Sequence, residues 1–109
     1  MQWQEVCDHP SLQNLPFKIE LNEKGQILMS PVKVYHSAFQ GKISRLLPDS
    51  GVVLPECAVK TTQGTKVADI AWASEERFKL IEHEAECSIA PELCIEVLSS
   101  SNTNLEMDE

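Results

Sequence analysis

The sequence predicts an α/β fold in the broad sense, a mixed α+β sheet with helices packed against it. Segments with strand character alternate with segments of helical character, and turns separate them. The chain has 109 residues, of which 42% are hydrophobic and 24% charged, as in one globular domain with a small core. We expect a single domain over residues 1–109, divided into an N-terminal hairpin region (1–35) and the main part of the domain (36–109).

The first elements are a hairpin and a helix. After a polar lead-in, Ile19 and Leu21 alternate with polar residues, the letters NEKG supply a turn, and a proline ends the returning strand, so residues 17–31 predict a β-hairpin. Residues 36–47 then carry apolar side chains at helical spacing and stop before a proline. This pattern predicts an amphipathic helix.

Three strands and a charged connection follow. Residues 51–61 predict a strand, and Pro55 within it removes a ladder donor, which favours an edge position. Residues 66–74 predict a second strand after a TQGT turn, and residues 75–86 are charged and helical in composition. Residues 91–100 predict a third strand. The letters after it contain good N-cap residues and predict the start of another helix.

The charge of the chain is unevenly distributed. Its net charge is −8, and all of this excess arises in residues 75–109, because acidic and basic residues cancel in residues 1–74. A basic footprint that would neutralise phosphates is not evident, which counts against nucleic-acid binding. No apolar run is long enough to span a bilayer and no secretory signal is visible, so we expect a soluble, cytoplasmic protein with no membrane partner.

The cysteines predict reduced, structural thiols. They are irregularly spaced and form no C-x-x-C pair of the kind that binds zinc or works as a redox dithiol. His83 and Cys87 have a spacing that could place both on one face of a helix, but two ligands do not make a metal site. We interpret these two side chains as solvated.

Two acids stand out because they interrupt apolar strands: Asp69 in VADIAW and Glu96 in CIEVLS. If the two strands pair, both carboxylates can project from one face at adjacent positions. Converging carboxylates repel unless one is protonated or a cation lies between them. Mg²⁺ is held in proteins by one or two carboxylates plus other oxygens. A metal site and a structural ion pair both remain open on spacing alone.

The series KIELNEKGQILMSP, YHSAFQGKISRLL, VADIAWAS and APELCIEVLSSSN resembles the Uma-type family of restriction endonucleases, within the PD-(D/E)xK nuclease-like superfamily. The resemblance runs over nearly the whole chain and implies a restriction-endonuclease-like core. It implies Mg²⁺ or Mn²⁺ as cofactor, held by Asp69, Glu96 and the backbone carbonyl of Val97. Glu20 would be a further acid of the site or an exposed strand carboxylate. His36 would contact the site or the substrate, or cap and pack the helix locally.

The chain departs from the superfamily pattern in its lysine. In the D/E-x-K form a lysine stands two residues after the acid, where this chain has Leu98, and no lysine follows Lys79. Lys66, near Asp69, falls on the opposite face of a regular strand. In Uma-type proteins the lysine lies on a following helix. We therefore expect a truncated copy of the core that lacks its last helix and strand, with a sheet edge left uncovered.

Two functions follow from this reading. The first is a Mg²⁺-dependent endonuclease domain that hydrolyses DNA phosphodiesters, impaired by truncation. The second is a catalytically inactive residual or accessory domain that acts through a protein partner, or a second copy of the chain, at the exposed sheet. A small domain with no site ranks last, because it gives no reason for Glu96 among apolar neighbours.

Overall fold

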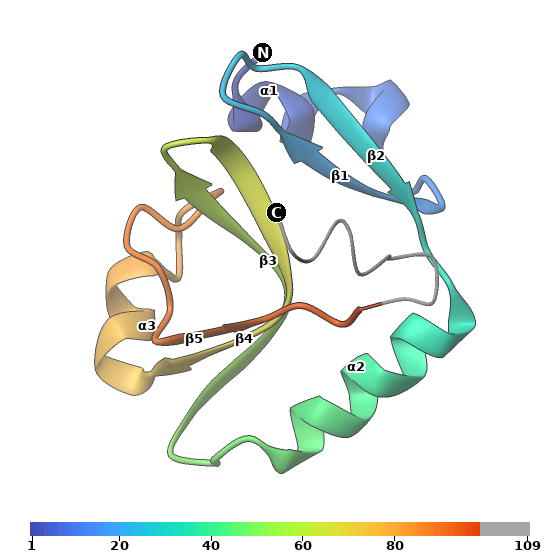
Figure 1. The fold of residues 1–109 in the computed structure, drawn as a ribbon. Helices are drawn as coiled ribbons and strands as arrows, with labels where there is room; N and C mark the ends of the chain where they lie inside the picture. The colour runs from blue at the N-terminus through green and yellow to red at the C-terminus, as the bar shows by residue number, and fades with distance from the viewer. Residues whose placement is uncertain (99–109) are drawn as a thin grey trace.

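A computed structural model shows an α+β fold and describes residues 1–98. The helices are α1 (Trp3–Asp8), the short 3₁₀ helix η1 (Pro10–Leu12), α2 (Val34–Leu46) and α3 (Glu75–Ile81). The strands are β1 (Phe17–Leu21), β2 (Ile27–Pro31), β3 (Gly51–Thr61), β4 (Gly64–Ser74) and β5 (Leu93–Ile95). They form a two-stranded and a three-stranded sheet, both antiparallel, with the helices around them (Figure 1). The predicted fold class is confirmed.

The hairpin predicted over residues 17–31 is confirmed as β1 and β2, which pair along their whole length. The side-chain oxygen of Asn22 closes the turn by accepting hydrogen bonds from the backbone N–H groups of Lys24 and Gln26 (3.0 and 2.9 Å). Gly25 has a φ of +75°, a conformation that glycine adopts without steric cost. The letters NEKG therefore form the predicted turn.

In the three-stranded sheet, β4 is central and β3 lies at an edge, as Pro55 predicts. Next to this proline, Glu56 has a φ of +53°, and the paired register of β3 with β4 skips the Glu56–Asp69 position. Leu54 and Cys57 both pack against the same core cluster, although strict alternation would send them to opposite faces. The irregularity at Glu56 thus redirects β3 at the level of Asp69.

The β1–β2 hairpin docks against β4. Gly64, the first residue of β4, has a φ of +101°, and a Cβ at this position would collide with the backbone of Leu21 and Asn22. Further along, the carboxylate of Glu20 accepts a hydrogen bond from the backbone N–H of Val67 (2.6 Å). These contacts fix β1 against the first half of β4.

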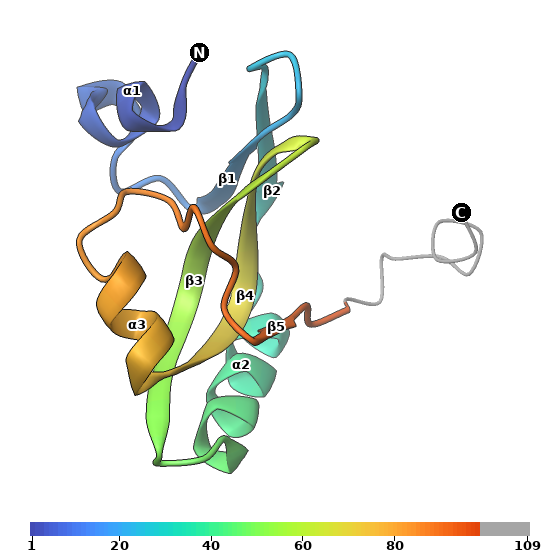
Figure 2. The ribbon, with the colours of Figure 1, turned by 90° about the vertical axis from the view of Figure 1, so that its left-hand side faces the viewer.

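Helices α2 and α3 lie on opposite faces of the three-stranded sheet (Figure 2). The side chain of Ser74 caps α3 by accepting a hydrogen bond from the backbone N–H of Arg77 (3.2 Å). Ile81, at the end of α3, packs into the core with β3 and β4. The buried residues of this cluster are Cys57, Val59, Ala71, Ile81 and Cys87.

The charged connection differs from its prediction. Helix α3 ends at Ile81, whereas the composition predicted a helix through residue 86. The chain instead turns back to β3, where Cys87 exchanges backbone hydrogen bonds with Ala58 and Lys60 (2.8 and 3.0 Å). Cys87 is buried, so its interpretation as a solvated side chain is wrong, while His83 is exposed as expected.

The polar lead-in contains helix α1, which the sequence analysis did not predict. Gln2 and Glu5 form a capping box at its start, and Val6 is buried. The indole N–H of Trp3 donates to the backbone carbonyl of Ala85 (3.1 Å), which ties α1 to the segment after α3. A segment of six residues is too short to carry a periodicity that would identify such a helix.

The third predicted strand is shorter than expected, with paired residues only from Leu93 to Ile95 in the described part of the chain. The end of this predicted strand and the predicted helix start after it lie outside the described residues. Within residues 1–98, no helix is long and apolar enough to cross a membrane.

Candidate functional site

The sheet brings the two acids that interrupt apolar strands to facing positions. β4 and β5 are antiparallel, and their last paired residues at this end are Ile70 and Ile95. One residue further, the same register places Asp69 opposite Glu96. Side chains at facing positions of neighbouring strands share one face, with their Cβ atoms about 4.5–5.5 Å apart. The register of β4 and β5 therefore places the carboxylates of Asp69 and Glu96 next to each other on one face of the sheet.

Asp69 is the centre of the site. Its side chain is only 1% exposed, and both carboxylate oxygens accept hydrogen bonds. Oδ1 accepts from the ammonium of Lys18 (3.0 Å), and Oδ2 accepts from the backbone N–H of Val97 (2.7 Å) and lies 3.0 Å from His36 Nε2. Burial alone would raise the pKa of Asp69, but the Val97 N–H and the Lys18 ammonium outweigh it and lower this pKa.

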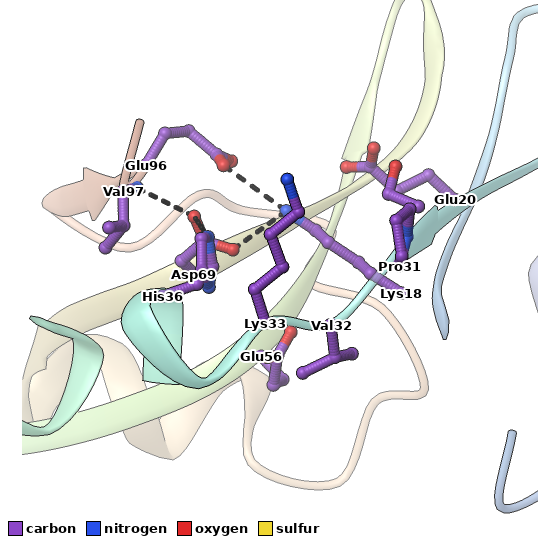
Figure 3. Close-up of a pocket in the computed structure, with 11 residues that line it drawn as sticks. Lys18, Glu20, Pro31, Val32, Lys33, His36, Glu56, Asp69, Glu96 and Val97 are labelled. Atoms are coloured by element: carbon purple, nitrogen blue, oxygen red, sulfur yellow. Dashed lines mark hydrogen bonds and ion pairs between the residues drawn. The ribbon is translucent and has the colours of Figure 1, made fainter. Parts of the chain in front are cut away.

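Lys18 was not among the predicted site residues. Figure 3 shows its side chain reaching from β1 to the two carboxylates, and its Nζ lies 3.3 Å from Glu96 Oε2 as well as against Asp69. Burial alone would lower the pKa of Lys18, but the hydrogen bond to Asp69 and the charges of Glu96 and Asp69 raise it above its ordinary value. The cation between the carboxylates is therefore a protonated lysine.

A signal for Lys18 was present in the sequence. In the letters KIEL, the apolar residues of β1 alternate with polar ones, so Lys18 shares its face of the strand with Glu20. Glu20 was predicted as a site residue, whereas a lysine was expected two residues after Glu96 or on a following helix. The structure instead brings it from a strand 51 residues before Asp69 in the chain.

Glu96 is more open than Asp69. Its side chain retains 56% exposure and faces the pocket. Partial burial, together with the neighbouring Asp69 carboxylate, raises the pKa of Glu96 to about 7, against the opposing effect of the Lys18 charge. The two acids therefore differ in their ionisation. Asp69 has a lowered pKa and is ionised at neutral pH, whereas Glu96 gains or loses its proton near neutral pH.

The two less specific candidates also reach this region. Glu20 lines the pocket, but its carboxylate accepts the backbone N–H of Val67, so it anchors β1 to β4. His36 lies in the first turn of α2 and its Nε2 contacts Asp69 directly. This contact joins α2 to Asp69, and a role of His36 in binding substrate stays a prediction.

Gln40 completes the support of Asp69. One turn after His36, its side-chain amide donates to the backbone carbonyl of Asp69 and to Glu56 Oε1 (2.5 and 3.2 Å). This carbonyl lies where the β3–β4 ladder skips a pair, so the amide of Gln40 replaces a missing strand partner. The irregular residue Glu56 and the helix α2 therefore hold Asp69 from two sides.

These side chains line a pocket of about 360 Å³ between β1, β2, α2 and the end of β5. Its lining residues are Lys18, Glu20, Ser30, Pro31, Val32, Lys33, His36, Glu56, Asp69, Glu96 and Val97. All the predicted site residues, Asp69, Glu96, Glu20, His36 and Val97, therefore border one cavity.

The family model described as "Uma2: Putative restriction endonuclease" matches residues 3–109. The chain belongs to this family. No curated protein matches the chain. Membership in a restriction endonuclease family indicates a nuclease. The resemblance read from the sequence letters is confirmed.

Restriction-endonuclease-like proteins generally depend on a metal ion, and the donors in this member of the Uma2 family can be compared with that requirement. Within residues 1–98, no group of three or more His, Cys, Asp or Glu side chains is arranged to hold a metal ion. Two carboxylates at a pocket fit Mg²⁺ or Mn²⁺, because hard divalent ions are held by few carboxylates and keep several waters. A site of this kind already attracts positive charge, as the position of Lys18 shows.

Val97 contacts the site in a different way from the one predicted. Its backbone N–H donates to Asp69, and so positions a carboxylate rather than an ion. The ligand role of the Val97 carbonyl stays a prediction.

Proposed function

We propose that this Uma2 family member is a Mg²⁺- or Mn²⁺-dependent endonuclease domain that hydrolyses DNA phosphodiesters. The observation that supports it is the pair of facing carboxylates, Asp69 and Glu96, at the rim of one pocket with a cation between them. Such a pair is costly for an ordinary sheet, since like charges at facing positions destabilise it. The match to a restriction endonuclease family supports hydrolysis of phosphodiesters as the reaction at this pair of carboxylates.

The residues of the site have separable roles in this proposal. Asp69, held by Val97, His36 and Gln40, is the fixed ligand, and the more exposed Glu96 is the adaptable one. A divalent ion bound there lowers the pKa of a water ligand and offsets charge on a phosphate.

The reaction that these residues serve is hydrolysis. The water oxygen forms a bond to phosphorus, the bond from phosphorus to the leaving sugar oxygen breaks, one water proton goes to solvent, and the leaving oxygen gains a proton. His36, at the pocket edge, holds Asp69 in position and borders the space that the phosphate would occupy. Glu20 keeps β1 against the site.

Metal binding and DNA nicking test the proposal together. Calorimetry with Mg²⁺ and Mn²⁺, followed by a supercoiled-plasmid nicking assay, compares the wild type with Asp69→Ala, Glu96→Ala and the double variant. We expect binding and nicking to disappear in the double variant. Glu23→Gln, on the exposed hairpin turn, is the matched control and should behave as the wild type. A folded wild type that binds neither ion and nicks no plasmid contradicts the proposal.

A second candidate function is an accessory domain that works through a protein partner or a second copy of the chain. It is favoured by α2, which has no buried residue and exposes Val34 (89%) and Leu46 (83%). Apolar side chains left exposed on this helix are candidates for contact with a partner. Light scattering across a concentration series, with Val34→Lys and Leu46→Lys as variants, tests this function. A dimer that the variants disrupt supports it. A monomer at all concentrations excludes a second copy of the chain as the partner.

A further inference from the structure

We propose that Lys18 supplies the positive charge that binds and neutralises the scissile phosphate in this site. The inference rests on the proposed function and adds to it a residue that was not among the predicted site residues. Its basis is geometric: the Lys18 ammonium lies 3.0 Å from Asp69 Oδ1 and 3.3 Å from Glu96 Oε2, and its side chain lines the same pocket.

The position of the Lys18 ammonium is set by the docking of β1 against β4. Lys18 and Glu20 lie on one face of β1, and Glu20 is bound to the backbone N–H of Val67 on β4, two residues before Asp69. The Lys18 side chain is only 16% exposed, so its long stem is packed rather than mobile. A cation on a fixed strand is preorganised, which is the condition under which charge stabilisation contributes most to a reaction.

The charge balance of the site favours such a group. Two ionised carboxylates and one divalent ion cancel, and a phosphodiester then adds one negative charge to a chain that is already acidic. Lys18 provides one positive charge at this position. A lysine ammonium has three N–H donors, and two of them go to Asp69 and Glu96. We assign the third to a non-bridging phosphate oxygen, with Lys18 remaining protonated throughout.

Lys33 is the competing lysine. It stands just before α2 and lines the same pocket. The structure favours Lys18, because its ammonium contacts both of the carboxylates that are proposed to hold the ion. The test therefore has to compare these two side chains directly.

The experiment uses the full chain with Lys18→Met, Lys18→Arg and Lys33→Met. Lys24→Met, exposed on the turn of the same hairpin, is the matched control. Three quantities are measured: the plasmid nicking rate at saturating Mg²⁺, Mg²⁺ affinity by calorimetry, and the affinity for a short DNA duplex in Ca²⁺. Thermal melting confirms that each variant is folded at the assay temperature.

We expect Lys18→Met to lower the nicking rate by about 10²–10³-fold, the usual effect of removing one preorganised charge-stabilising group. Its Mg²⁺ affinity should be no weaker than that of the wild type, because Lys18 is not a ligand, and its DNA affinity in Ca²⁺ should fall several-fold. Lys18→Arg, which keeps the charge, should recover part of the rate. If Lys18→Met melts below the assay temperature, Lys18→Gln is judged by the same criteria.

Other outcomes overturn the inference in distinguishable ways. Nicking by Lys18→Met within threefold of the wild type, or a loss confined to Lys33→Met, overturns the assignment and leaves the proposed function intact. Loss of Mg²⁺ binding together with nicking in Lys18→Met shows that the lysine only organises the ligands, which also overturns it. A wild type that binds Mg²⁺ but nicks no DNA overturns the nuclease function and this inference together.

Discussion

At the scale of single residues, Asp69 carries most of the constraints of the site. It is buried and charged, and a buried charge is tolerated only when it is paired and hydrogen-bonded. Its partners come from three directions: Lys18 on β1, His36 on α2 and the backbone of Val97 after β5. Asp69 therefore joins three separate parts of the chain at one point.

Replacing Asp69 by Asn should destabilise the protein even without metal. Asn preserves the size of the side chain but removes the charge that balances the partly buried Lys18 ammonium, and breaking one partner of a buried pair costs at most about 3–5 kcal/mol. Urea unfolding in the presence of EDTA measures the free energy of unfolding, with the exposed Asp49→Asn as control. A loss below about 1 kcal/mol would show that the pair is not a structural element.

A second residue-scale prediction concerns Cys57. Burial, followed by its contact with Cys87 at 3.5 Å, raises the pKa of Cys57 to about 12 from 9.0. Because the folded-state pKa is raised, the associated stability is fully present below pH 9 and is lost as the pH rises toward 12. The midpoint of thermal unfolding should therefore fall more steeply between pH 9 and 11 in the wild type than in Cys57→Ala. Equal slopes would contradict the prediction.

At the scale of elements, the site depends on how β1 is attached to β4. The hairpin is an isolated two-stranded sheet, and such a sheet is marginally stable unless it packs against something else. The hydrogen bond from Val67 to Glu20 and the close approach at Gly64 provide this packing. Since Lys18 is on the same strand, this attachment also fixes the position of Lys18 in the site.

Replacing Glu20 by Ala should loosen that attachment. A hydrogen bond to a charged group contributes about 1.5–3 kcal/mol, so the free energy of unfolding should fall by about this amount. Hydrogen exchange at the Val67 amide is the specific measurement, because this N–H donates to Glu20 and should exchange faster in the variant. Glu23→Ala in the same hairpin should change neither quantity. Unaltered exchange at Val67 would rule out the anchoring role.

At the scale of the whole molecule, the charges are separated in a way that the net value hides. The net charge of −8 arises in residues 75–109, whereas residues 24–48 contain four basic residues and no acidic one. This acid-free stretch includes α2, which begins beside the pocket with His36 and exposes Lys42 and Arg45 further along. A phosphate backbone approaching the site would therefore meet α2 with less repulsion than the rest of the surface.

Neutralising Lys42 and Arg45 to Gln should weaken DNA binding without affecting Mg²⁺ affinity. Each phosphate contact that is lost reduces the slope of log affinity against log salt concentration by about 0.9 for duplex DNA. Fluorescence anisotropy in Ca²⁺ over a salt series measures this slope. Lys79→Gln, exposed on α3 in the acidic part of the chain, is the control and should leave it unchanged. An identical slope in the α2 variant would exclude α2 as the contact surface.

The sequence by itself determined the local elements and one long-range relation, the proximity of Asp69 to Glu96. Alternation, turn letters and prolines identified the hairpin, α2, β3 and β4, because these patterns record which face of a segment is buried. The apolar neighbours of Asp69 and Glu96 marked both acids, and pairing of their strands then brought the two together. Helix α1 and the early end of α3 were beyond this reasoning, since tertiary contacts at Trp3 and Cys87 decide them.

Only the tertiary structure decided which cation joins the two acids. Lys18 is 51 residues from Asp69 and 78 from Glu96 in the chain, and no local period connects them. Their meeting depends on the docking of one hairpin against a different sheet, a relation set by the packing at Gly64 and by the Glu20–Val67 hydrogen bond. Local patterns record burial and backbone conformation within a segment, whereas the choice of ion-pair partner depends on how separate segments are placed in space.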